Sequence, residues 1–336
     1  MRVLEQAGDE NDGRKVRSVR EWLHQCRFGV VTAIVITLFT AYALLDVFVI
    51  PHEYSDAVSV ESGIELKIAK AENPVGNLEQ VETKTQLAAT SSEPVITENS
   101  YRDANISVEI TQYRVSETDV YVADVRVSSP EYLLSAFAKG KYGRNVTEAT
   151  SSTAERVDAI LAVNGDYYGA RNSGYVIRNG VLYRSKSGGN EDLVMYADGS
   201  FAVISESQIS ADKLLEDGAV QVWSFGPGLI VDGEISVSAK QEVGRAMASN
   251  PRTAIAYVGE NHYLLVVADG RTGASDGLTL YELASFLQTL GVQTAYNLDG
   301  GGSSTMVFLG EVVNNPTTGG NRISERSVSD IVYIGY

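Results

Sequence analysis

The sequence is poor in the side chains that build covalent cross-links and metal centres. Its 336 residues include one cysteine, Cys26, and three histidines, which excludes an internal disulfide framework and a zinc site built on cysteine. Positive charge is also scarce, because 27 lysines and arginines stand against 43 acidic residues and give a formal charge of −16. Such a chain repels phosphate backbones, so we expect no nucleic-acid partner.

Histidine chemistry is limited in the same way. Only His262 lies beyond residue 52, so the C-terminal part of the chain cannot build a centre that needs several histidines. A Ser-His-Asp triad would have to use this one residue, which stands in a predicted hairpin turn. Acid–base chemistry is therefore expected from carboxylates.

A long apolar run occupies residues 28–50, where Asp46 is the single charged residue. The run is long enough to cross a membrane as a helix, and five basic residues lie between Arg14 and Arg27. The positive-inside rule then places residues 1–27 in the cytoplasm and the remainder outside. We interpret residues 28–50 as an uncleaved transmembrane signal anchor, which predicts a single-pass cell-membrane protein with an extracytoplasmic C-terminal domain.

Two regions of different composition follow the apolar run. Residues 51–100 are rich in Glu, Ser, Thr and Ala, with Tyr54 as the only aromatic residue, and such a segment buries little surface. We interpret it as a flexible, disordered acidic stalk. Residues 101–336 have no internal linker, so we expect one compact α+β domain that is rich in β-structure, with a mixed sheet and flanking helices.

Local patterns predict most elements of this domain. Alternation predicts strands at 106–113 and 119–127. Asn-Gly or Asp-Gly pairs at Asn179, Asp198 and Asp232 predict three hairpins with type I′ turns. Apolar runs predict further strands, namely 253–258, 263–268, 294–298, 304–309 and 331–334.

Two helices are expected. Residues 151–162 form the first, opened by Ser151 or Ser152. Residues 279–291 form the second, with Thr279 and Glu282 in capping-box positions. The strand–helix–strand order around the second helix predicts one parallel crossover within the mixed sheet.

The most unusual segment, NLDGGGSS, follows an apolar strand. Three consecutive glycines leave backbone N–H groups open to a ligand oxyanion, and serine hydroxyls can add donors. A glycine-rich turn between two strands is the simpler alternative. The candidate phosphate-binding residues here are Asn297, Gly300, Gly301, Gly302, Ser303 and Ser304, with Asp299 as a candidate catalytic carboxylate.

Charged and polar residues also stand at other strand ends. Asn164 and Asp166 lie in NGDYY, a combination that suits a sugar site as well as a simple hairpin turn. Arg252, Arg271 and Arg326 are candidates for binding a phosphodiester, provided that they converge; singly, each is a surface ion-pair partner.

Aspartates also allow a metal centre. Asp166, Asp269 and Asp299 could form an all-carboxylate site for Ca²⁺ or Mg²⁺. No cofactor is otherwise expected, and the binding of a divalent cation is left open.

Together these motifs resemble the phosphodiester glycosidase domain family. NGDYY, FGPGLIVDG, NPRTAIAY, ADGR and AYNLDGGGSSTMV occur in the family's order, over roughly residues 120–336. The resemblance implies hydrolysis of a sugar, N-acetylglucosamine-like, from a sugar-1-phosphodiester. It also implies a shared pocket containing Asp166, Arg252, Asp269, Asn297, Asp299, Gly300, Gly301, Gly302, Ser303 and Arg326.

We therefore expect an extracytoplasmic hydrolase acting on a phosphodiester-linked glycan of the cell envelope or an exopolysaccharide. Asp299 is the expected leading carboxylate, with Asp269 or Asp166 as its partner. Two alternatives stay open. One is a metal-dependent phosphodiesterase that cleaves P–O, and the other is a non-catalytic envelope module that binds glycans.

Overall fold

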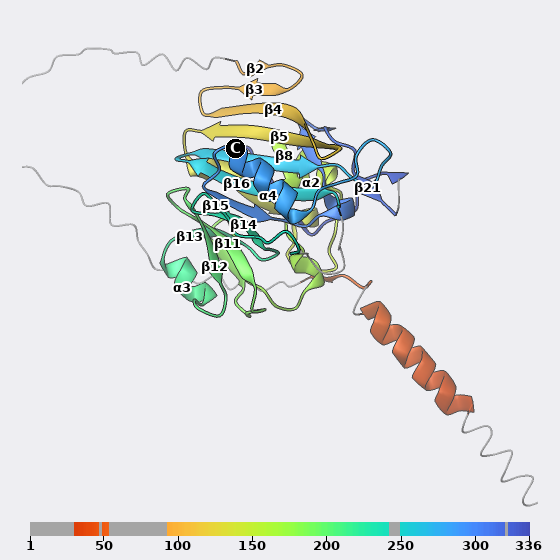
Figure 1. Cartoon of the computed structure of the whole chain (residues 1–336). Helices are drawn as coiled ribbons and strands as arrows, with labels where there is room; N and C mark the ends of the chain where they lie inside the picture. The colour runs from red at the N-terminus through yellow and green to blue at the C-terminus, as the bar shows by residue number, and fades with distance from the viewer. Residues whose placement is uncertain (1–29, 47–48, 54–92, 242–248, 320–321) are drawn as a thin grey trace, which may run out of the picture. The chain divides into compact units, whose positions relative to one another are not determined.

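The computed structural model describes residues 30–46, 49–53, 93–241, 249–319 and 322–336 (Figure 1). The chain divides into two compact units, residues 1–51 and 52–336. In the first unit, residues 30–46 form a helix inside the predicted span 28–50, of which residues 28–29 and 47–48 lie outside the described residues. No helix in the described ranges is both long and apolar enough to cross a membrane.

Most of the predicted stalk, residues 54–92, lies outside the described residues. The described ends of the 51–100 range contain short strands of the second unit. β1 (His52–Glu53) pairs with β7 (Gly143–Arg144), and β2 (Val95–Ile96) pairs with β3 (Ser100–Arg102).

The largest element of the second unit is a nine-stranded sheet in the order β15-β14-β18-β16-β17-β5-β4-β3-β2. The predicted strands at 106–113 and 119–127 are confirmed as parts of one long hairpin. The bounds not yet given are β4 (Ile106–Val115), β5 (Thr118–Val127), β14 (Gly228–Val231), β15 (Glu234–Ile235), β16 (Arg252–Gly259), β17 (His262–Ala268) and β18 (Thr294–Asn297).

The predicted parallel crossover is present, but the sheet is antiparallel rather than mixed. β17 and β18 run in the same direction on either side of the helix that joins them, but β16 lies between them and pairs antiparallel with both. All strand pairs among the described residues are antiparallel. The hairpin β16–β17 forms locally, so it occupies the position that a parallel neighbour would need.

Two five-stranded sheets face the large one. The first has the order β10-β9-β13-β11-β12 and the second β20-β19-β8-β23-β6. Their strands are β6 (Leu133–Phe137), β8 (Leu161–Asn164), β9 (Val176–Arg178), β10 (Val181–Arg184), β11 (Glu191–Tyr196), β12 (Phe201–Ser205), β13 (Ala219–Trp223), β19 (Met306–Phe308), β20 (Glu311–Val312) and β23 (Asp330–Ile334). β21 (Thr317–Thr318) and β22 (Arg322–Ile323) form a separate pair.

The three hairpins predicted from Asn-Gly and Asp-Gly pairs are confirmed, but one turn type is wrong. Asn179 and Asp232 both have a φ angle of 52°, and the glycines that follow them have φ angles of 78° and 80°. Positive φ at both central residues agrees with type I′ turns. At the third turn only Gly199 has positive φ. The Asp198 carboxylate accepts hydrogen bonds from the N–H and hydroxyl of Ser200, which holds Asp198 in a different turn.

The helices cover the outer faces of the sheets. α4 (Leu280–Thr289) has the predicted capping box. α2 (Thr150–Arg156) is shorter than the predicted helix 151–162, because residues 161–164 are buried as strand β8. It begins at Thr150 without a side-chain cap, and the Ser151 hydroxyl donates to Glu325 instead. α3 (Ala211–Glu216) begins at a Ser210 cap.

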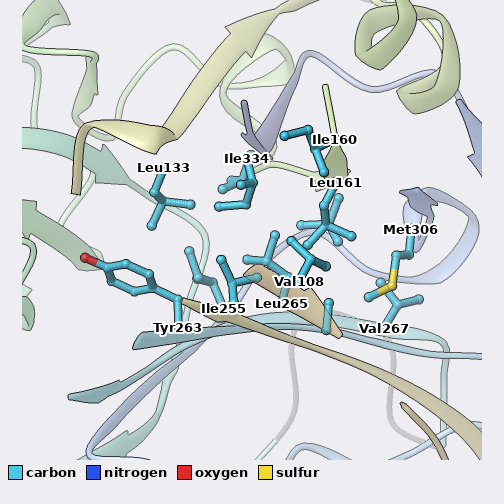
Figure 2. Close-up of a cluster of buried hydrophobic side chains, with 14 of the residues drawn as sticks. Val108, Leu133, Ile160, Leu161, Ile255, Tyr263, Leu265, Val267, Met306 and Ile334 are labelled. Carbon is cyan, nitrogen blue, oxygen red and sulfur yellow. The ribbon is translucent and has the colours of Figure 1, made fainter. Parts of the chain in front are cut away.

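The main core lies between the sheets. Side chains of the large sheet, such as Val108 and Leu265, pack against Leu133, Leu161 and Ile334 of the second five-stranded sheet (Figure 2). On its other face the large sheet packs on α4, while α2 and α3 each cover one of the smaller sheets. The predicted β-rich domain with flanking helices is therefore confirmed, as a layered sandwich.

Candidate active site

The middle of the large sheet brings several chain segments to one end. Because β16 pairs antiparallel with both β17 and β18, its first residues lie beside the last residues of its neighbours. Arg252 is opposite Ala268, and Ala254 is opposite Asn297. The loops that follow β17 and β18, which contain most of the predicted site residues, therefore leave the sheet beside Arg252.

A pocket of about 190 Å³ lies at this end of the sheet. Arg252, Arg271 and Arg326 all line it, so the structure brings together the three arginines at strand ends. Among the described lining residues there is one carboxylate, Asp299. The pocket is therefore cationic in a chain of net charge −16, and it suits an anionic ligand. Its other described lining residues are Phe225, Asn250, Asn297, Gly300 and Gly301.

Asp299 is held by a compact polar network. Its Oδ2 atom lies 2.8 Å from Nη2 of Arg326 and accepts a 2.7 Å hydrogen bond from the Ser303 hydroxyl. Arg326 also donates through Nε to that hydroxyl and through Nη2 to the carbonyl of Gly300. Burial raises the pKa of the Asp299 carboxyl above its ordinary value, while Arg326 and Ser303 lower it. A partly desolvated carboxylate of this kind is a suitable general base.

The other two arginines are fixed by different contacts. Arg271 donates through Nε and Nη2 to Oδ1 of Asn250, at 3.2 and 2.9 Å. Arg252 is buried and donates through Nε to the carbonyl of Leu278 at 2.9 Å. Both guanidinium groups are thereby oriented before any ligand binds, which lowers the entropic cost of binding an anion.

The glycine triplet allows close packing of the loop. A Cβ atom on Gly300 would lie 2.9 Å from the carbonyl oxygen of Pro251, and one on Gly301, whose φ is +62°, would lie 3.0 Å from Nη2 of Arg271. The N–H of Gly301 donates to the Pro251 carbonyl, so it is not open to a ligand. Gly302 contacts Thr318 rather than the pocket.

Two pocket residues were not predicted from the sequence. Phe225 follows β13, and Asn250 lies two residues before the start of β16. Both stand inside motifs that carried the family resemblance, FGPG and NPRTA. Neither contains a charged group, so a search for strand-end charges passes over them.

Asn164 and Ser304 lie outside the described pocket lining. The Asn164 side chain is fully buried, where Nδ2 donates to the carbonyl of Asp299 at 2.6 Å and Oδ1 accepts from the Thr253 hydroxyl at 2.7 Å. Ser304 is also buried, and its carbonyl accepts from Asn314. Asn164 therefore does not line the pocket, and its hydrogen bond to the Asp299 carbonyl positions the loop that carries Asp299.

Asp166 belongs to a buried ion triad. Its Oδ2 atom lies 2.8 Å from Nη2 of Arg178, and the same guanidinium lies 2.7 Å from Asp330. Asp166 also accepts from the N–H groups of Tyr168 and Ser224. The pKa of the Asp330 carboxyl is raised to about 7. Burial is the main cause; Arg178 lowers the pKa, and the charge of Asp166 raises it. Both oxygens of Asp166 are thus occupied by protein donors.

Asp269 is likewise engaged away from the pocket. Its oxygens accept hydrogen bonds from the side chain of Asn314 and from the N–H and side chain of Asn315. The carboxylate therefore holds the loop after β20. Of the three candidate catalytic aspartates, only Asp299 lines the pocket.

The three aspartates do not gather into one site. Within the described ranges, no group of three or more His, Cys, Asp or Glu side chains is arranged to hold a metal ion. The sequence GASDG at residues 273–277 has the pattern of a nucleophile elbow, but the Ser275 hydroxyl donates to Asp119. His262 pairs with Asp124 at the opposite end of β17, so these residues form no triad.

Comparisons with known proteins identify the family of the chain. The family model described as phosphodiester glycosidase matches residues 158–335, more than half of the chain. The chain is 32% identical over 184 residues to human N-acetylglucosamine-1-phosphodiester alpha-N-acetylglucosaminidase, covering 49% of this chain and 35% of that protein. It is 30% identical over 203 residues to the SPbeta prophage-derived uncharacterized protein YomE of Bacillus subtilis strain 168, covering 58% and 31%. The chain thus spans about a third of the length of these relatives.

Solved structures share the fold. The zebrafish N-acetylglucosamine-1-phosphodiester alpha-N-acetylglucosaminidase catalytic domain, auto-inhibited by its pro-peptide, superposes with a TM-score of 0.55 at 24% identity, covering 69% of this chain and 83% of that one. A hypothetical protein from Synechocystis gives a TM-score of 0.50 at 16% identity, covering 69% and 62%.

Proposed function

Because the chain belongs to the phosphodiester glycosidase family, we propose that it hydrolyses a sugar-1-phosphodiester and releases the sugar. The observation that carries this proposal is the convergence of three arginines and one carboxylate on a single pocket. The arginines match a singly charged phosphodiester, and the carboxylate supplies the base that hydrolysis needs.

The arginines stabilise the negative charge of the leaving group. When the bond between the anomeric carbon and its oxygen breaks, negative charge builds up on the departing phosphate. Guanidinium groups bind phosphate through charge-assisted, paired hydrogen bonds, and pre-oriented charges of this kind stabilise a transition state without rearrangement. Because a phosphate monoester is a weak base, its departure needs little help from a general acid.

Asp299 acts as the general base that activates the attacking water. In the proposed step the water oxygen bonds to the anomeric carbon while the carbon–oxygen bond to phosphate breaks and its electron pair leaves with the phosphate. The proton from the water passes to the Asp299 carboxylate and then to solvent. Asp166 and Asp269 are saturated by protein donors, so we assign this role to Asp299 alone.

A single terminal sugar is the proposed substrate unit. At about 190 Å³ the pocket is smaller than the roughly 300–1,000 Å³ typical of drug-sized ligands, which favours one sugar residue with its phosphate. The names of the human and zebrafish relatives support N-acetylglucosamine as the first sugar to test.

The cellular setting rests on the sequence. The apolar run at residues 28–50 behind a basic segment supports an extracytoplasmic enzyme acting on envelope or exopolysaccharide glycans. Carbonate extraction of the full chain from membranes tests this proposal: release into the soluble fraction contradicts a membrane anchor.

Product analysis in H₂¹⁸O tests the reaction. The full chain is incubated with an α-N-acetylglucosaminyl phosphodiester, with and without EDTA, and the phosphate product is analysed by mass. We expect free sugar and an unlabelled phosphate monoester in both tubes, since cleavage at carbon puts the water oxygen on the sugar. The Asp299→Asn variant is the matched control.

Other outcomes separate the alternatives. Labelled phosphate, or sugar-1-phosphate formed only without chelator, contradicts the proposal in favour of P–O cleavage by a metal-dependent phosphodiesterase. Binding of the diester without any turnover contradicts it in favour of a glycan-binding module.

A further inference from the structure

The pocket carries a feature that phosphate binding does not use. Phe225 lines it with a half-buried aromatic ring. Its N–H donates to the Tyr296 hydroxyl at 2.9 Å, which in turn donates to the carbonyl of Glu191. The guanidinium of Arg171 lies 5.3 Å from the ring centroid. Arg171 is not among the described lining residues, so it supports the ring from outside the pocket.

A buried acceptor belongs to Asn297, another residue of the same pocket lining. Nδ2 of Asn297 donates to the carbonyl of Gly226, the residue after Phe225, at 2.8 Å. This contact fixes the amide orientation and leaves Oδ1 as the other atom. Asn297 is 1% exposed and lines the pocket, and its Oδ1 has no hydrogen-bond partner among the described residues. A buried acceptor left in this state is unfavourable, and a donor group on a ligand would relieve it.

The pocket thus has two kinds of wall. One is charged, with Arg326 bound to Asp299 and Arg271 packed against Gly301. The other is uncharged and is formed by Phe225 and Asn297, which are joined through Gly226. A flat apolar ring and an unused acceptor in one pocket match a pyranose, which has a C–H face and hydroxyl or amide donors at its edge.

We propose that Phe225 and Asn297 form the sugar subsite: the ring packs on the C–H face of a pyranose, and Oδ1 of Asn297 accepts a hydrogen bond from a hydroxyl or amide N–H of that sugar. This inference rests on the proposed function, because it assigns the two halves of the substrate to the two walls. Phe225 is a specificity-determining residue in this arrangement, and the arginines bind the phosphate without reading the sugar.

Binding of the two half-ligands tests the assignment without requiring turnover. Affinities of the full chain for N-acetylglucosamine and for methyl phosphate are measured separately by ligand-observed NMR. Phe225→Leu should weaken sugar binding by about two- to tenfold, the range of an aromatic contact, and leave methyl phosphate unchanged. Arg271→Gln should do the reverse. Phe225→Tyr keeps the ring and should keep sugar affinity.

Phe286→Leu is the matched control, because Phe286 is a half-buried phenylalanine that packs on Tyr113 away from the pocket. Equal loss of both ligands in Phe225→Leu, or unchanged sugar binding, overturns the subsite. If N-acetylglucosamine does not bind, glucose, galactose and mannose are tried, and failure of all four also overturns it.

A series of sugars that each lack one hydroxyl or the acetamido group tests the Asn297 contact on the unmodified chain. Removing the one group that donates to Oδ1 leaves this acceptor unpaired again, so one such loss should weaken binding by about tenfold or more, while the others change it little. A flat series contradicts the contact. Wild-type binding of both half-ligands without hydrolysis of the diester leaves the subsite standing and contradicts only the proposed reaction.

Discussion

The Nη2 atom of Arg326 lies 2.8 Å from Oδ2 of Asp299, although the arginine is largely exposed and the aspartate is buried. The two side chains line the same pocket. The Arg326 guanidinium is therefore placed to interact both with the Asp299 carboxylate and with an anionic ligand in the pocket.

Removing this arginine should move the pH profile. The charge of Arg326 lowers the pKa of Asp299, which burial raises. In Arg326→Gln that pKa rises, so the base is protonated up to a higher pH and the acid limb of kcat/KM shifts upward. Exposed Arg322→Gln is the control. An unmoved limb would show that another group titrates.

Neutralising the base should abolish most turnover. Asp299→Asn keeps an acceptor for Ser303 and Arg326 but cannot take a proton, so kcat should fall by about 10²- to 10⁴-fold, with an unchanged melting temperature. Glu311→Gln, on an exposed hairpin, is compared in the same assay. Near-normal activity of the Asp299 variant removes this residue from the role.

Asp269→Asn should act on stability instead. The amide would turn a donor toward the N–H and side chain of Asn315, which now donate to the carboxylate. Unfolding in urea should show a loss of about 1–3 kcal/mol, while kcat/KM measured well below the melting temperature changes only a few-fold. If kcat falls as far as in Asp299→Asn without loss of stability, Asp269 is the catalytic partner after all.

The buried Asp192 should make stability fall with rising pH. Burial, with the charge of Glu206, raises its pKa from 3.8 to about 9, so the folded chain keeps a proton that the unfolded chain releases above about pH 4. The contribution of Asp192 to stability is then largest below about pH 4 and declines until pH passes 9. Asp192→Asn cannot titrate and should flatten the free energy of unfolding between pH 5 and 9. A parallel decline in both chains would contradict this.

Gly165→Ala should break the ion triad. A Cβ atom at this position would lie 2.3 Å from Oδ1 of Asp330, and displacing this carboxylate leaves Arg178 incompletely paired in the core. Disrupting a buried pair costs about 3–5 kcal/mol, which urea unfolding measures. Gly273→Ala, with open space around its Cβ, should be neutral by comparison.

The features that the sequence predicted well are local. The hairpin turn at Asn179 and the capping box of Thr279 and Glu282 each lie within a few residues, so the pattern contains the whole interaction. The order of strands is different, because β16 takes its place beside β18 through pairings that span 37 to 43 residues. A short stretch of sequence does not contain the contacts that determine this strand order.

The same contrast applies to the site. Strand-end position was enough to nominate Arg252 and Arg271, since the antiparallel neighbours β16 and β17 bring such ends together. It also nominated Arg326, which reaches the pocket from the loop before β23 of another sheet. It could not separate Asp299 from Asp166. What distinguishes them is the partner of each, and Arg178 became the partner of Asp166 only through folding.

One buried amide joins the layers of the sandwich. Asn164 ends a strand of the smaller sheet, yet its side chain bonds Thr253 of the large sheet and the backbone of Asp299. Sliding the layers by even one residue would therefore dismantle the pocket. Among the described residues, this one side chain therefore ties the pocket to the packing of both layers, and we expect heating to remove the pocket together with that packing.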